Sequence, residues 1–198
     1  MSVRFVDPRT EEIVYPEPFE MPTNAVTPGL GTNAPPDGSL ALNPLLVPAA
    51  LLWDVGRPVE THAQHWPQAE RDKLSQSATW PPVGRLGLQS PHLPWRIEAL
   101  PRTPNIHVTV FDVLATIYVA LRLQITPGEW DRFDTGEKSV IVGARGVRVR
   151  ECDPDPQLDE LYAHPRRIDT LGERTRFAGL ILAPHRGPDS LDLELKRR

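Results

Sequence analysis

One stretch of the chain repeats its apolar residues at helical spacing. The six positions are Val110, Val113, Leu114, Ile117, Tyr118 and Leu121. These offsets place them along one side of an α-helix. Thr109 stands before the stripe as an N-cap, and Asp112 follows where a carboxylate can accept orphan amide groups. The pattern predicts an amphipathic helix over about residues 109–123 that packs its apolar side against another element.

A second helix start follows at once in "TPGEW". Thr126 has the position of an N-cap, Pro127 is the first helical residue, and Glu129 completes a capping box. In the polar, proline-interrupted residues 57–83, the segment 67–75 favours a further short helix.

Alternation of apolar and polar residues predicts strands in residues 51–55, 86–88, 95–99 and 191–196. The second and third of these flank a proline-bearing connection and predict an antiparallel pair. Residues 167–182 predict a hairpin that turns at Gly172 and Glu173. Together these elements predict a single α+β domain with a mostly antiparallel sheet. Helix 109–123 should cover one face of that sheet and leave a more polar face open.

Residues 137–151 give conflicting signals. Val140, Ile141 and Val142 favour a strand, whereas Gly143 and Gly146 favour neither strand nor helix. As a strand, this segment would place Arg148 and Arg150 on the same face. Helix and strand both stay open for residues 139–149.

The first 41 residues differ in composition from the rest of the chain. They hold seven of the 23 prolines, with six acidic residues against two basic ones. We expect an extended or disordered acidic arm, in which a short piece such as residues 12–15 can add to the body as an edge strand. Residues 42–198 form the predicted domain, with 20 basic and 20 acidic residues. This neutral balance argues against nucleic-acid binding.

The chain shows no sign of a membrane or secretory protein. No apolar run approaches the ~18 residues that cross a bilayer, and the first 20 residues hold no apolar signal region. Cys152 is the single cysteine, so no intrachain disulfide forms. We expect a soluble protein of the cytoplasm or nucleus that is not secreted.

Seven short motifs occur in a fixed order: "LNPLL", "LLWDV", "ATWPPVGRLGL", "LPWRIEA", "VTVFDVLATIYVAL", "TPGEW" and "RIDTLGERTRFAGL". The set spans residues 42–182 and resembles an uncharacterised domain family common in mushroom-forming fungi. The resemblance implies a single α+β domain, often behind a proline-rich arm. It implies no activity, cofactor or catalytic residue. Members of that family look helical where this chain has "SVIVGARGVRV".

The sequence offers few residues for chemistry. His62 and His65 lie three apart, but no third metal ligand follows at a suitable spacing, even with His92 in view. The acidic neighbours of Cys152 disfavour its thiolate, and the "ECDPDP" run fits no calcium loop. No serine-nucleophile, phosphate-loop or dinucleotide fingerprint is present. We therefore predict no catalytic residue, no metal and no cofactor.

Trp66 and Trp80 are the candidate binding residues. Three of the five tryptophans, Trp53, Trp95 and Trp130, fit core positions, whereas these two lie in proline-rich loops as "HWP" and "TWPP". A loop tryptophan either packs beneath its loop or contacts a partner, since tryptophan is enriched at binding hot spots. Our first hypothesis is a non-catalytic module that binds a protein or peptide through Trp66 and Trp80.

Two other functions stay open. The first is a hydrolase-like enzyme that pairs a carboxylate with one of the histidines His62, His65, His92 and His107. The second is a small-molecule binding fold with its pocket between the helix and the sheet. Neither the partner nor the oligomeric state follows from the sequence.

Overall fold

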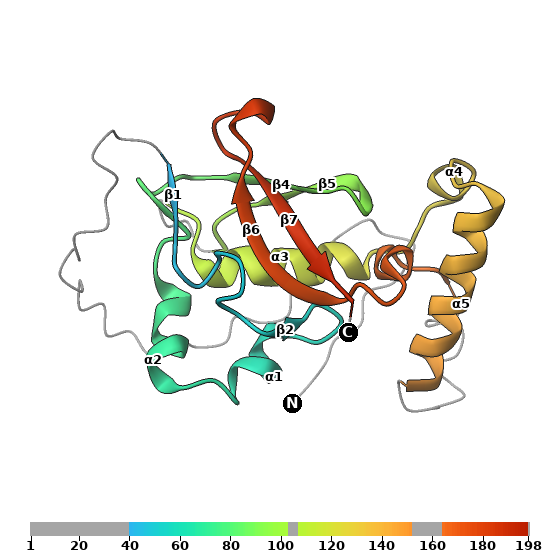
Figure 1. Cartoon of the computed structure of the whole chain (residues 1–198), viewed down its shortest axis with the longest axis horizontal. Coiled ribbons are helices and arrows are strands. Elements are labelled where there is room, and N and C mark those ends of the chain that lie inside the picture. The colour runs from blue at the N-terminus through green and yellow to red at the C-terminus, as the bar shows by residue number, and fades with distance from the viewer. Residues whose placement is uncertain (1–39, 103–106, 152–163, 198) are drawn as a thin grey trace. The chain divides into compact units, whose positions relative to one another are not determined.

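The computed structural model describes residues 40–102, 107–151 and 164–197, all within one compact unit (Figure 1). Its strands are β1 (Ala41–Leu42), β2 (Trp53–Asp54), β3 (Thr79–Trp80), β4 (Leu86–Ser90), β5 (Leu93–Ala99), β6 (Arg176–Leu182) and β7 (Ser190–Lys196). Its α-helices are α1 (Val59–Ala63), α2 (Gln68–Arg71), α3 (Val110–Arg122), α4 (Pro127–Trp130) and α5 (Thr135–Glu151). Short 3-10 helices are η1 (Asp72–Ser75), η2 (Arg167–Leu171) and η3 (Pro184–Arg186). This mixture confirms the predicted α+β class.

Five strands form the main sheet in the order β2-β6-β7-β4-β5. The pairs β2–β6, β6–β7 and β4–β5 are antiparallel, and β4–β7 is parallel. The predicted antiparallel pairing of residues 86–88 with 95–99 is therefore confirmed. Strands β1 and β3 form a separate two-stranded antiparallel sheet.

The core lies between the main sheet and α3. Trp53, Phe177 and Leu195 stand opposite one another on β2, β6 and β7, and all three are buried. On α3 the fully buried residues include Val113, Leu114 and Ile117, whereas Tyr118 is only partly buried. Figure 1 shows α3 running behind β6 and β7. The apolar side chains of helix and sheet thus belong to one hydrophobic cluster.

The start of α3 depends on the capping box that the sequence predicts. Thr109 Oγ1 accepts a hydrogen bond from the Asp112 amide at 3.1 Å, and Asp112 Oδ2 accepts one from the Thr109 amide at 2.9 Å. The box at Thr126 and Glu129 is also present and begins α4. The short helix predicted over residues 67–75 corresponds to α2 and η1.

The predicted hairpin at Gly172 and Glu173 is wrong. Residues before that turn form η2, not a strand, because Ile168 and Leu171 are three residues apart and both are buried. Asp169 stabilises the start of η2 by accepting a hydrogen bond from the Arg166 amide at 2.8 Å. The hairpin partner of β6 is instead β7, which follows after η3.

Residues 135–151 form helix α5, which decides between the two predicted alternatives and excludes the strand. Ile141 is buried, whereas Val140 and Val142 are about half exposed. Arg148 donates hydrogen bonds to Asp169 of η2 from Nε and Nη2, each at 2.8 Å. Arg148 and Arg150 therefore do not share a strand face. Packing of α5 against η2 outweighs the modest strand preference of the three β-branched residues.

Other predictions have mixed outcomes. Trp53 is buried as expected of a core residue, whereas Trp95 and Trp130 are only partly buried. Among the described helices, none has the length and apolar character needed to cross a membrane. The acidic arm, apart from its last two residues, and Cys152 lie outside the described residues, so the expectations for them stay predictions.

Candidate functional site

Strand β2 lies at one edge of the main sheet, and Leu52 is the residue just before it. The Val55 amide donates to the Thr175 carbonyl of the β6 side at 2.8 Å. Because hydrogen-bonding direction alternates along an antiparallel pair, Leu52 points its N–H and C=O away from β6. Within the part of the chain that the structure describes, neither group of Leu52 has a hydrogen-bond partner. The Leu52 side chain is also 62% exposed.

An open hollow of about 320 Å³ lies beside this edge. It is lined by Leu52, Trp53, Asp54, His62 and Arg176. Trp53 is held by the core and by a hydrogen bond from its indole Nε1 to the Arg57 carbonyl at 3.0 Å. His62 belongs to α1, which is fixed to the core by the fully buried Val59. The hollow is therefore built by residues 52–62 and, far from them in the sequence, Arg176.

His62 links the hollow to Trp66, one of the two predicted binding residues. The rings of His62 and Trp66 lie 6.4 Å apart, centre to centre, with a tilt of 57°. Trp66 is partly buried and packs against the core cluster. The Nδ1 atom of His62 is buried and, within the described ranges, has no hydrogen-bond partner. Trp66 thus supports the His62 ring rather than lining the hollow itself.

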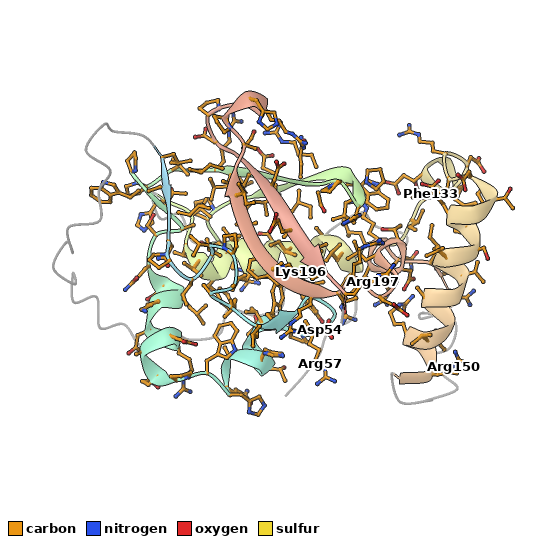
Figure 2. All side chains as sticks on the ribbon, viewed as in Figure 1. Asp54, Arg57, Phe133, Arg150, Lys196 and Arg197 are labelled. Carbon is orange, nitrogen blue, oxygen red and sulfur yellow. The ribbon has the colours of Figure 1, made fainter. Side chains whose placement is uncertain are left out.

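Basic residues gather at this end of the sheet. Asp54, Arg176 and Lys196 stand opposite one another on β2, β6 and β7. Arg176 therefore stands between an anion, Asp54, on one side and a cation, Lys196, on the other. Figure 2 shows Arg57 close to Asp54, and Arg197 beside Lys196.

Acidic residues are fewer at this end. Asp54 already accepts a hydrogen bond from the Gly56 amide at 2.9 Å, and the other carboxylates nearby in sequence are Glu60, Glu173 and Glu194. Against them stand five basic residues, Arg57, Arg174, Arg176, Lys196 and Arg197. The hollow therefore combines apolar walls with a positively charged margin.

The other predicted residues lie elsewhere. Trp80 is on β3 opposite Ala41, with 38% of its surface exposed, and does not line the hollow. His65 lies after α1, His92 between β4 and β5, and His107 before α3. Burial and the charge of Arg174 lower the pKa of His92 below its usual 6.5. Among the described residues, no cluster of histidine, aspartate and glutamate is arranged to hold a metal ion.

A family model described as "Family of unknown function (DUF6699)" matches residues 51–190. The chain belongs to this DUF6699 family. No curated protein and no solved structure matches the chain. The predicted resemblance to an uncharacterised domain family is confirmed to that extent.

The DUF6699 match contains every residue that lines the hollow. It begins at Leu51, just before β2, and ends at Ser190, the first residue of β7. Lys196 and Arg197, at the charged margin, lie beyond the matched residues. The family assignment thus includes the hollow but provides no activity for it.

Sequence reasoning missed Leu52 and Arg176 as site residues of the DUF6699 domain. Leu52 resembles any apolar residue in an alternating strand, and its exposure depends on β2 being the edge strand. Arg176 reaches the hollow only because β6 pairs with a strand more than a hundred residues earlier. One signal was available in the sequence. Asp54, Arg176 and Lys196 are polar residues in three segments that the sequence predicts, at least in part, as strands.

Proposed function

We propose that this DUF6699 chain is a non-catalytic module that binds an extended segment of a partner protein at the sheet edge beside Leu52, just before β2. The observation that carries the proposal is that the N–H and C=O of Leu52, beside a hollow with apolar walls, have no partner among the described residues. An extended peptide satisfies such groups by adding a strand to the sheet, and side-chain pockets give the interaction its specificity.

The chemistry of the site defines the segment that it accepts. An apolar side chain of the peptide would enter the hollow against Leu52 and Trp53. An acidic side chain next to it would meet Arg176, because guanidinium and carboxylate form strong paired hydrogen bonds. The partner segment is therefore extended, apolar at one position and acidic at a neighbouring one.

The two predicted tryptophans have different places in this proposal. Trp66 is assigned a supporting role, because its ring packs on His62. Trp80 is a separate exposed contact on β3. We propose that Trp80 enlarges the partner surface, which a Trp80→Ala variant tests by weakening partner binding without affecting the hollow.

Fewer observations support the other two functions. Among the described residues, no histidine is hydrogen-bonded to a carboxylate, as a hydrolytic pair would require. The hollow with His62 lies at the sheet edge, and not between α3 and the sheet as the small-molecule hypothesis expects. Binding of a protein segment would use the exposed Leu52 side chain and the hollow beside it.

Immobilised peptides of matched composition test the proposal. One set places glutamate beside a leucine, and a second set replaces each glutamate by lysine. We expect wild-type protein to bind the acidic set, and Leu52→Lys to weaken that binding at least about tenfold, equal to about 1.4 kcal/mol. Arg176→Glu should shift the preference toward the basic set. Leu100→Lys is the matched control, because Leu100 is 53% exposed and lies outside the hollow.

Three results would contradict the proposal. Equal binding of both peptide sets would show that Arg176 does not select the peptide by charge. Equal losses of binding in Leu52→Lys and Leu100→Lys would show that the peptide does not bind at Leu52. Cleavage of the bound peptides, followed by mass spectrometry, would show an enzyme instead. Circular dichroism of each variant separates these results from loss of the fold.

A further inference from the structure

A second, smaller hollow lies where β4, β5 and the loop after η3 meet. Its volume is about 90 Å³, and it is lined by three arginines, Arg85, Arg96 and Arg186, together with Gly87, Glu98 and Asp189 among others. A water molecule takes about 30 Å³ in the liquid. The hollow therefore has room for a small polyatomic ion.

Gly87 makes room for the guanidinium of Arg96. A Cβ atom built on Gly87 would collide with Nη2 of Arg96 and would lie 2.8 Å from its Nε. On one side Gly87 stands opposite Ser190 of β7, and on the other opposite Glu98 of β5. The Arg96 guanidinium therefore lies against the bare main chain of β4, and any side chain at position 87 would displace it.

The three arginines differ in how well their charge is compensated. Arg186 is 3.2 Å from Asp192 and donates to Gln89 at 2.6 Å. Arg85 lies 3.8 Å from Glu98, and both side chains are more than half exposed, so this ion pair contributes little. Arg96 has no ion pair and no side-chain hydrogen bond among the described residues.

The three lining arginines outnumber the two lining carboxylates, Glu98 and Asp189. Arg85 is paired with Glu98 and Arg186 with Asp192, which leaves Arg96 as the lining arginine without an ion pair among the described residues. A hollow of this size suits an anion with several oxygen atoms, because the planar guanidinium of Arg96 can donate two parallel hydrogen bonds. Arg186 can add a bond from Nη2, since its Nε donates to His185 and its Nη1 to Gln89.

From this arrangement we infer that the hollow over Gly87 binds a phosphoryl group, in which Arg96 is the principal ligand and Arg186 the second. The group is either inorganic phosphate or a phosphorylated side chain of a partner. This site is separate from the β2 hollow and does not depend on the function proposed for it.

Nuclear magnetic resonance of the full-length, nitrogen-15-labelled chain tests the inference. Inorganic phosphate, a phosphoserine peptide and the same peptide without phosphate are added in turn at constant ionic strength. We expect saturable shifts of the Gly87 amide and the Arg96 Nε–H signal with a phosphoryl compound. Binding should be stronger near pH 7.5 than near pH 5, since the second phosphate pKa is about 6.

Three variants separate a built site from general charge attraction. Arg96→Gln removes the charge, and Gly87→Ala keeps every charge but displaces the guanidinium. Each should weaken binding at least tenfold. Arg132→Gln removes an exposed arginine outside the hollow and should leave binding unchanged.

Each outcome decides a specific point. Shifts with inorganic phosphate support an anion site, and shifts with the phosphopeptide alone support a site for a modified partner. No saturable shift with either compound, or equal binding by wild type and Arg96→Gln, overturns the inference. If Gly87→Ala fails to fold, Arg96→Gln and Arg132→Gln still decide the result.

Discussion

Trp95 and Glu129 are joined by a hydrogen bond although 34 residues separate them in the chain. Indole Nε1 of Trp95 donates to Oε1 of Glu129 at 2.5 Å, and Arg167 Nη2 donates to the same oxygen at 2.9 Å. The Arg167 guanidinium also lies 4.6 Å from the centre of a Trp95 ring. One carboxylate therefore connects β5, α4 and η2, three elements that are not neighbours in the sequence.

This contact predicts how the stability of the protein depends on pH. Burial by itself raises the pKa of Glu129. Hydrogen bonds from the Thr126 amide and hydroxyl, from Trp95 and from Arg167 lower it by more, so that the pKa falls to about 2. The unfolded carboxyl titrates near 4.5. The stabilisation is therefore complete above about pH 4.5 and is lost as the pH falls toward 2. It amounts to at most about 3 kcal/mol.

The variant Glu129→Gln tests this dependence. Its unfolding free energy in urea should lie below that of the wild type near neutral pH, and the difference should shrink as the pH falls toward about 3. Glu137→Gln is a suitable control, because Glu137 is an exposed carboxylate that accepts one hydrogen bond from the Asp134 amide. A difference that stays constant over this pH range would show that the Glu129 carboxylate is not the titrating group.

A buried ion pair between Arg148 and Asp169 holds α5 on η2. The side chain of Asp169 is 2% exposed and that of Arg148 is 12% exposed. Asp169→Ala leaves the Arg148 charge buried and also removes the hydrogen bond to the Arg166 amide. We expect the free energy of unfolding to fall by about 3–5 kcal/mol, because an uncompensated buried charge is costly.

Paired variants show whether the lost charge compensation is the cause. The double variant Arg148→Met with Asp169→Leu should be less destabilised than Asp169→Ala, since no charge stays buried. Urea unfolding of the three proteins makes the comparison. The explanation fails if the double variant is the least stable of them.

Two glycines should respond to alanine in opposite directions. Gly179 has a φ of 131°, and a Cβ there would lie 2.5 Å from Pro48 Cα. Gly179→Ala should therefore cost at least about 2 kcal/mol of stability. Gly146 lies within α5 with nothing within 4 Å of its Cβ position. Gly146→Ala should gain about 0.5–1 kcal/mol, because alanine favours helix.

Thermal unfolding monitored by circular dichroism measures both glycine variants against the wild type. A raised midpoint for Gly146→Ala and a lowered one for Gly179→Ala are expected. A stable Gly179→Ala protein would show that the segment around Pro48 moves away from β6 at little cost.

Local signals in the sequence predicted several elements well. The capping boxes at Thr109 and Thr126 were readable because their residues are three apart, and the interactions they form stay within one turn. The alternation in residues 190–196 identified β7, because burying one face of a strand requires period two. Each of these features depends on residues that are close in sequence.

Where the local signals were weak or conflicting, contacts with residues distant in the sequence determined the secondary structure. Residues 139–149 became a helix because α5 packs on η2, where Arg148 donates a hydrogen bond to Asp169, 21 residues later in the chain. The hairpin at Gly172 was wrong because burial of Ile168 and Leu171 favours a 3-10 turn. In both places the contact energy of distant residues exceeded a small backbone preference.

By itself the sequence determined the α+β class, the starts of α3 and α4, and which side chains of β4, β5 and β7 enter the core. The tertiary structure decided the strand order, the edge position of β2, and the two hollows beside Leu52 and Gly87. The physical reason is that capping and periodicity act over a few residues. An edge or a hollow exists only once segments such as 52–62 and residue 176 are brought together by burial of the core.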